Sequence, residues 1–255
     1  MRELYRYRDL IWALVARDLK VRYRRSVIGL FWSMLQPLLT LTVMTVVFST
    51  MFRFELANYP VYALSGILFW NFFHQSIVAS MNSLKGYSHI LQKLPVPMAV
   101  FPVSTVISGI VNLLLALIPM LLIVVFTHHG VGPSLLFLPI SILIAAVFTL
   151  GAGLLLAPLA VFFGDVVELI TVVLTLLFYM TPIFYPKSIV EGHRFYFLIR
   201  YNPARSILEV FRDPIYLQKI PPLSHLTVAT LVALLALGIG AWAFRRSGDR
   251  IPFYL

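Results

Sequence analysis

The chain has 255 residues, of which 60% are hydrophobic and only 12% are charged, and its mean hydropathy is +0.90. A soluble globular domain carries roughly 25% charged residues. This composition therefore excludes a soluble globular domain and indicates an integral membrane protein. The net charge of +10 does not indicate nucleic-acid binding, because the Lys and Arg residues flank hydrophobic runs and form no separate basic domain. The absence of cysteine excludes disulfides, thiolate chemistry and cysteine-based metal sites.

The first element expected is a helix over residues 3–25. Aromatic side chains such as Trp12 fall along one stripe of this helix, and cationic side chains such as Arg17 fall along another. This arrangement is typical of an amphipathic helix that lies in the membrane interface. We therefore expect an interface helix on the cytoplasmic side, directly before the first membrane span.

Six apolar runs follow, each close to the ~20 residues that a helix needs to cross the hydrocarbon. The chain is therefore expected to be an all-α membrane protein, with a single transmembrane domain over residues 1–255. Lys and Arg are concentrated before the first span and in the short loop and tail after spans two and six, which predicts that both termini are cytoplasmic. The expected spans are 27–52, 60–83, 98–126, 134–163, 166–185 and 223–244.

Two connecting segments are expected to hold structure of their own. Residues 84–97 form a short cytoplasmic loop with room for one or two helical turns. Residues 186–222 are too long for a bare connector and are expected to hold two short external helices. The sequence SIVE at 188–191 matches a capping box, and Asn202 followed by Pro203 predicts the start of the second helix.

The spans lack the side chains of several transport and enzyme classes. No acidic residue lies in the interior of a span, although Asp165 and Glu168 come close at the turn between spans four and five, and this disfavours a proton- or sodium-coupled transporter. The ionisable side chain inside span two is His74, for which we expect a packing role. The sequence contains no phosphate-binding Gly-x-x-x-x-Gly-Lys-Ser/Thr motif and no hydrolase motif. We therefore expect no catalytic residues, no metal site and no cofactor in this chain, and any ATP hydrolysis would come from another subunit.

Aromatic side chains are dense near Pro37 in the first span and Pro182 in the fifth. They have two interpretations: interface belts and core packing, or a path in which aromatic faces stack on sugar rings. A proline inside a span frees a carbonyl that protein or water must satisfy, which favours a helix facing protein or an aqueous path. The candidates to line such a path are Phe31, Trp32, Gln36, Phe178, Tyr179 and Thr181.

Four stretches resemble, in order, the ABC-2 type permeases that export polysaccharides, and the O-antigen permeases most of all. They are RDLKVRYRRSVIGLFWSMLQPLL (17–39), LQKLPVPMAVFPVS (91–104), VFFGDVVELITVVLTLLFYMTPIFYP (161–186) and RYNPARSILEVFRD (200–213). Gly164 departs from this pattern, because a basic residue is expected before Asp165.

The resemblance implies a homodimer in the bacterial inner membrane, paired with two ATP-binding subunits that hold ATP and magnesium. The channel would lie at the dimer interface, lined by spans one and five, and pass a polymer on undecaprenyl diphosphate. The external helices would form a gate, and the N-terminal helix would be a second contact with the ATPase. The loop 84–97 would hold the coupling helix, with contacts from Lys85, Tyr87, His89, Leu91 and Lys93.

The basic strip before span one has a matching interpretation. Arg22, Arg24 and Arg25 are candidates to bind the lipid pyrophosphate, the alternative being that they contact only anionic phospholipid. Two other function classes remain open from the sequence: an ABC-2 permease for a small lipid or drug, and a membrane-embedded transferase. For the transferase, Asp165 and Glu168 are the acidic pair that the chain offers.

Overall fold

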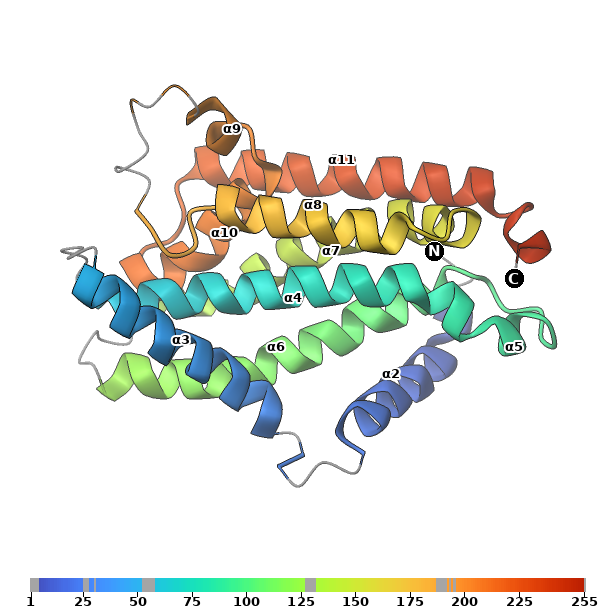
Figure 1. Ribbon diagram of the computed structural model, residues 1–255, viewed down its shortest axis with the longest axis horizontal. Helices are drawn as coiled ribbons and strands as arrows, with labels where there is room; N and C mark the ends of the chain where they lie inside the picture. Colours follow the sequence, from blue (N-terminus) through green and yellow to red (C-terminus); the bar gives the residue numbers. More distant parts are fainter. Residues whose placement is uncertain are drawn as a thin grey trace.

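A computed structural model describes residues 5–24, 28–29, 31–51, 58–126, 132–186, 192, 194 and 196–254. All the regular secondary structure in these ranges is helical (Figure 1). The longer helices are α2 (Arg8–Tyr23), α3 (Phe31–Met51), α4 (Tyr59–Gly86), α6 (Val100–Phe126), α7 (Leu138–Phe162), α8 (Val166–Met180), α10 (Pro203–Arg212) and α11 (Leu223–Ser247). The shorter ones are α5 (Ser88–Leu91), η1 (Pro133–Phe137), α9 (Tyr196–Arg200), the π-helical η3 (Asp213–Leu217) and η4 (Ile251–Phe253).

The core of the bundle consists of α4, α6, α7 and α11. Helix α4 packs against α6 on one side and α7 on the other, and α7 packs along α11. Apolar side chains of α4 such as Leu64, Phe69 and Met81 are fully buried at these contacts. Helices α7 and α11 approach very closely where Gly151 faces Gly240, because a Cβ built on Gly240 would lie 2.1 Å from the Gly151 carbonyl oxygen. Small residues of this kind let helix backbones touch inside a membrane.

Helices occupy all six predicted spans. Three of them are long and apolar enough to cross a membrane: Val100–Phe126, Pro133–Phe162 and Leu223–Ser247. Phe31–Met44 and Val166–Met180 are shorter apolar helices. In Figure 1 the marked chain ends lie at the same end of the bundle as α5, and α9 and α10 lie toward the other end.

The fifth predicted span ends earlier than the sequence analysis expected. Helix α8 stops at Met180, and Thr181 takes an extended conformation, with φ −97° and ψ 131°. The reason is Pro182, since proline disfavours the helical conformation of the residue before it and has no N–H to donate. Pro182 therefore terminates the helix, and the expected kinked span to residue 185 was wrong in this detail.

The N-terminal helix forms as predicted, as α2, but it uses two different faces. Ile11, Leu14 and Val15 are buried, where α2 packs against α6. Tyr5 and Trp12 remain 72% and 60% exposed. One face thus packs on protein, and Tyr5 and Trp12 lie outside that contact.

The two connecting segments also hold helices. Helix α5 is a single turn inside the predicted loop 84–97, because α4 continues to Gly86. Two short helices, α9 and α10, lie between α8 and α11, and the Asn202 side chain accepts a hydrogen bond from the Ala204 N–H as the predicted cap. The capping-box pattern at 188–191 lies outside the described residues.

Candidate functional site

A polar cavity of about 360 Å³ lies between α2, α4 and α6. A second cavity of about 90 Å³ shares Arg22, Gln75, Ser76, Gly109 and Asn112 with the first and extends to α3. We call the two together the polar cleft. Hydroxyl and amide side chains make up most of its wall on α4 and α6: Gln75, Ser76, Asn82, Ser83, Thr105, Ser108 and Asn112.

The helical period of the sequence produces this wall. Positions 76, 80 and 83 of α4 share one helix face, as do positions 105, 108 and 112 of α6. The two faces meet where Ser80 Oγ and Thr105 Oγ1 are 2.9 Å apart. Ser83 and Ser108 each donate a hydrogen bond to a backbone carbonyl of their own helix, at 2.7 and 3.0 Å. These hydroxyls are therefore satisfied within the protein.

Ser76 is different from its neighbours. Its side chain is 2% exposed, and within the described part of the chain its Oγ has no hydrogen-bond partner. A Cβ built on Gly109 would lie 2.1 Å from this oxygen, so glycine leaves room for the hydroxyl at that point. Ser76 and Gly109 each line the larger and the smaller cavity of the polar cleft.

The three arginines predicted to bind pyrophosphate have separate positions. Arg22 lines the polar cleft and donates a hydrogen bond from Nη2 to Gln75 Oε1. Arg24 is exposed and lies with Lys20 beside a different surface hollow on α2. Arg25 lies outside the described residues. Of the strip, Arg22 has the position from which a cation can reach a molecule inside the cleft.

The predicted coupling residues differ in how exposed they are. Lys85, His89 and Lys93 are exposed and Leu91 is half-buried, but Tyr87 is buried. Its ring stacks on Phe101 with centroids 5.1 Å apart, and its hydroxyl donates a hydrogen bond to the carboxylate of Asp18. Tyr87 therefore joins the loop to α2 and α6 from inside, and the expectation that its side chain contacts a partner needs this correction.

The surroundings of Tyr87 join α2 to the loop before α6. The guanidinium of Arg17 lies 4.7 Å from the centre of the Tyr87 ring. Burial raises the pKa of the Tyr87 hydroxyl well above its ordinary value, and the hydrogen bond to Asp18 adds to this. The hydroxyl thus remains a proton donor at physiological pH. At the start of α2, Tyr7 donates a second hydrogen bond to this loop, to the Pro95 carbonyl at 3.1 Å.

The candidate channel-lining residues fall into two groups. Phe31, Trp32 and Gln36 are exposed on α3, and Tyr179 is 68% exposed on α8. Phe178 is half-buried and packs on Trp70 and Phe184, with ring centroids 5.5 and 5.4 Å apart.

Thr181 is buried, and its Oγ1 accepts a hydrogen bond from Asn202. Thr181 therefore joins the end of α8 to the start of α10, and its place on the wall of a path stays a prediction.

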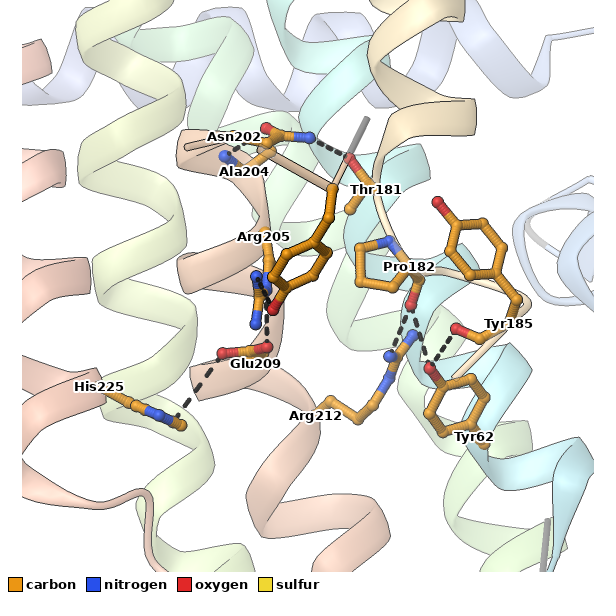
Figure 2. A network of polar contacts seen from close by, with 11 residues as sticks. Tyr62, Thr181, Pro182, Tyr185, Asn202, Ala204, Arg205, Glu209, Arg212 and His225 are labelled. Carbon is orange, nitrogen blue, oxygen red and sulfur yellow. Dashed lines mark hydrogen bonds and ion pairs between the residues drawn. The ribbon is translucent and has the colours of Figure 1, made fainter. Parts of the chain in front are cut away.

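A buried arginine on α10 was missed by the sequence analysis. Figure 2 shows Arg212 pointing into the segment that follows α8, where its guanidinium donates to the carbonyls of Pro182 and Ile183, at 2.8 and 3.0 Å. The guanidinium carbon also lies 3.9 Å from the centre of the Tyr62 ring on α4. The Tyr62 hydroxyl donates to the Pro182 carbonyl at 3.2 Å and the Tyr185 carbonyl at 2.8 Å.

This cluster, which we call the Arg212 network, fixes α10 to the rest of the bundle. Burial lowers the pKa of Arg212 from its ordinary value, and the neighbouring Tyr62 and the carboxylates of Glu209 and Asp213 oppose that change. Arginine nevertheless keeps its charge in proteins, so Arg212 acts as a permanent donor. Glu209 also pairs with Arg205 at 2.9 Å on the same helix (Figure 2).

Among the described residues, no three His, Asp or Glu side chains gather in a group that could hold a metal ion. Asp165, at the start of α8, is exposed, and so is Glu168 one turn later. The polar cleft offers the cations of Arg17 and Arg22 together with amides and hydroxyls.

Comparison with known proteins gives the family. The ABC-2 type transporter family matches residues 9–216. The O-antigen export system permease protein RfbA of Myxococcus xanthus is 32% identical over 242 residues, 92% of each chain. RfbA of Klebsiella pneumoniae is 31% identical over 208 residues, 80% of this chain and 79% of the relative, and the polysialic acid transport protein KpsM of Escherichia coli is 20% identical over 232 residues, 87% and 88%. The chain therefore belongs to the ABC-2 type transporter family.

Proposed function

We propose that this chain is the membrane permease of a bacterial ABC exporter that moves a lipid-linked polysaccharide, such as an O-antigen on undecaprenyl diphosphate, out of the cytoplasm. The observation that carries the proposal is the 32% identity to an O-antigen export permease across 92% of both chains. The polar cleft with Arg22 at its wall is compatible with a substrate that has an anionic, hydroxyl-rich headgroup. An exporter of a small apolar drug would have no use for so many hydroxyls and amides along one wall.

A strain that lacks this chain tests the proposal. We expect the deletion to remove the polysaccharide from the cell surface and to leave lipid-linked polymer in the cytoplasm, with both effects reversed by the intact gene. Unchanged surface polysaccharide, together with a lost resistance to a small lipid or drug, would instead support the alternative ABC-2 function.

In the proposed exporter the six helices α3, α4, α6, α7, α8 and α11 cross the inner membrane, and both termini face the cytoplasm. Because α5 lies at the same end of the bundle as the marked termini, it would face the cytoplasm with them (Figure 1). Exposed Lys85, His89 and Lys93, with Leu94 at 54% exposure beside them, would then form the contact with the ATP-binding subunit. That subunit would supply ATP and Mg²⁺, and two of each subunit would form the complete exporter.

The proposed homodimer uses the outward face of α8. Leu169, Val172, Leu176 and Tyr179 recur at helical spacing and are all more than half exposed, whereas Leu174 faces inward at 3% exposure. Because the native chain has no cysteine, single cysteines report this interface without background. We expect Val172→Cys to form disulfide-linked dimers in membranes and Leu174→Cys to form none. Equal cross-linking of both variants would contradict a dimer through this face.

The external helices α9 and α10 would control the outer mouth of the path. Helix α10 has fully buried apolar side chains, including Ile207, Leu208 and Phe211, and the Arg212 network holds its end. Helix α9 has more exposed side chains, with Phe197 at 52%. We therefore place the moving part of the proposed gate at α9 and treat α10 as its support.

A further inference from the structure

We propose that the polar cleft binds the first sugar and the adjoining phosphate of a lipid-linked sugar, inside a single subunit. The assignment rests on the proposed export function and adds to it the place where the headgroup is recognised. It puts this recognition between α2, α4 and α6, apart from the α8 face assigned to the dimer.

The first argument comes from Ser76. Buried polar groups in proteins almost always have hydrogen-bond partners, so each exception calls for a water or a ligand. Ser76 Oγ is such an exception among the described residues, and its residue lines both parts of the polar cleft. The Ser76 hydroxyl fills the place beside Gly109 that a Cβ would take. A hydroxyl-bearing group that enters the cleft would supply the missing partner after a small shift of this wall.

The second argument comes from the chemistry of the wall. The amides of Gln75, Asn82 and Asn112 both donate and accept hydrogen bonds, as sugar hydroxyls do. Arg17 and Arg22 add two cations, and a guanidinium is the side chain best shaped to hold phosphate oxygens. The acidic side chain on the wall, Asp18, is already engaged by the Tyr87 hydroxyl. Two cations beside a row of neutral polar groups therefore fit a phosphate attached to a sugar.

The third argument concerns size and continuity. A volume of about 360 Å³ falls in the ~300–1,000 Å³ range of small-molecule sites and cannot hold a polymer. The smaller cavity continues past Arg22 to Trp32 and Gln36 on α3. Trp32 is 48% exposed there and offers an aromatic face on which a sugar ring can stack. The cleft thus leads from a headgroup-sized space toward the helix proposed to line the path.

Binding of defined probes to the full-length permease in nanodiscs tests the assignment. The probes are a short prenyl diphosphate carrying N-acetylglucosamine, the same prenyl diphosphate without sugar, inorganic phosphate, and phosphatidylglycerol. We expect the sugar-bearing probe to bind at least tenfold more tightly than the sugar-free one. Equal affinities for the two prenyl probes, or full competition by phosphatidylglycerol or by inorganic phosphate, would overturn the proposal.

Matched variants locate the contacts. Ser76→Val and Asn112→Leu are expected to weaken the sugar-bearing probe about tenfold and to leave the sugar-free probe unchanged, whereas Arg22→Gln weakens both. Thr149→Val removes a buried hydroxyl from α7 that is satisfied at 2.7 Å by the Ala145 carbonyl, and it should change neither affinity. Lys20→Gln, which removes a charge from α2 outside the cleft, serves as the charge control.

Thermal stability and sugar affinity are both measured for each variant. Ser76→Val replaces an unpartnered hydroxyl by two methyl groups, so thermal unfolding is measured in parallel to show that the variant remains folded while sugar binding falls. Unchanged sugar affinity in both Ser76→Val and Asn112→Leu would refute the cleft assignment even if deletion of the chain abolishes polysaccharide export. Conversely, failure of the deletion phenotype would refute the export function, whatever the binding results.

Discussion

Replacing Arg212 by methionine should destabilise the α10 end of the bundle by about 3–5 kcal/mol, which is the usual cost of breaking a buried charged interaction. The side chain donates to the carbonyls of Pro182 and Ile183 and, at 3.4 Å, to Ser65 Oγ. Hydrogen bonds from a charged group contribute about 1.5–3 kcal/mol each, and a desolvated cation over an aromatic ring adds about 2 kcal/mol. These contributions are not additive, so the estimate stays near the buried-pair value.

The cost should fall unevenly on the acceptors that remain. The Pro182 carbonyl keeps Tyr62 as a donor, at 3.2 Å, but the Ile183 carbonyl is left inside the protein without the donor it had. Methionine fills much of the volume, so the measured loss reports hydrogen bonds and charge more than a cavity. Arg212→Lys keeps the charge without the planar fork and should show an intermediate loss.

Thermal unfolding of the detergent-purified protein, followed by size-exclusion chromatography after heating, measures this effect. At roughly 2–4 °C per kcal/mol for a chain of this size, the melting temperature should fall by about 6–20 °C. Arg200→Met, at an exposed position on α9, is the matched control and should change it by no more than about 2 °C. If Arg212→Met melts at the same temperature as this control, the Arg212 network does not stabilise the fold in the way argued.

Two further substitutions test the packing. Tyr87→Phe keeps the stacked ring but removes the donor to Asp18, and we expect a loss of about 1–3 kcal/mol in the free energy of unfolding, measured by denaturant titration. Gly240→Ala places a methyl group against the Gly151 backbone and should cost about 1–3 kcal/mol by overpacking. Gly238→Ala, with no described atom within 4 Å of its new Cβ, should be neutral or should stabilise the helix by up to about 1 kcal/mol. Equal melting temperatures for the two alanine variants would contradict the close crossing of α7 and α11.

The helices were predictable because long apolar runs and caps are local signals. Asn202 and Pro203 mark the start of α10 by side-chain chemistry that acts within one turn. Pro182 also predicts the end of α8, since it constrains the residue before it. The apolar run nevertheless continues to residue 185, so hydropathy alone places the end of the span too late. Hydropathy records where a chain is apolar, and it does not record where a helix stops.

The sites were less predictable because they depend on which faces meet. Nothing local distinguishes Arg212 from the exposed Arg200 twelve residues earlier, since both follow apolar residues in the same external segment. Burial of Arg212 requires the carbonyls after α8 and the Tyr62 ring, which come from distant parts of the chain. Ser76 likewise becomes notable only when Gly109 of another helix is placed beside it.

Tyr87 lies where two of the proposed roles meet. It belongs to the loop proposed to dock on the ATP-binding subunit, and it also lines the polar cleft proposed to hold the headgroup. Its hydrogen bond to Asp18 holds α2, the helix that carries Arg22, so a displacement of α5 changes the position of a cleft residue. Energetic coupling between two binding sites is reciprocal. Occupation of the cleft should therefore alter the affinity for the ATP-binding subunit by the same factor as docking alters the affinity for the headgroup.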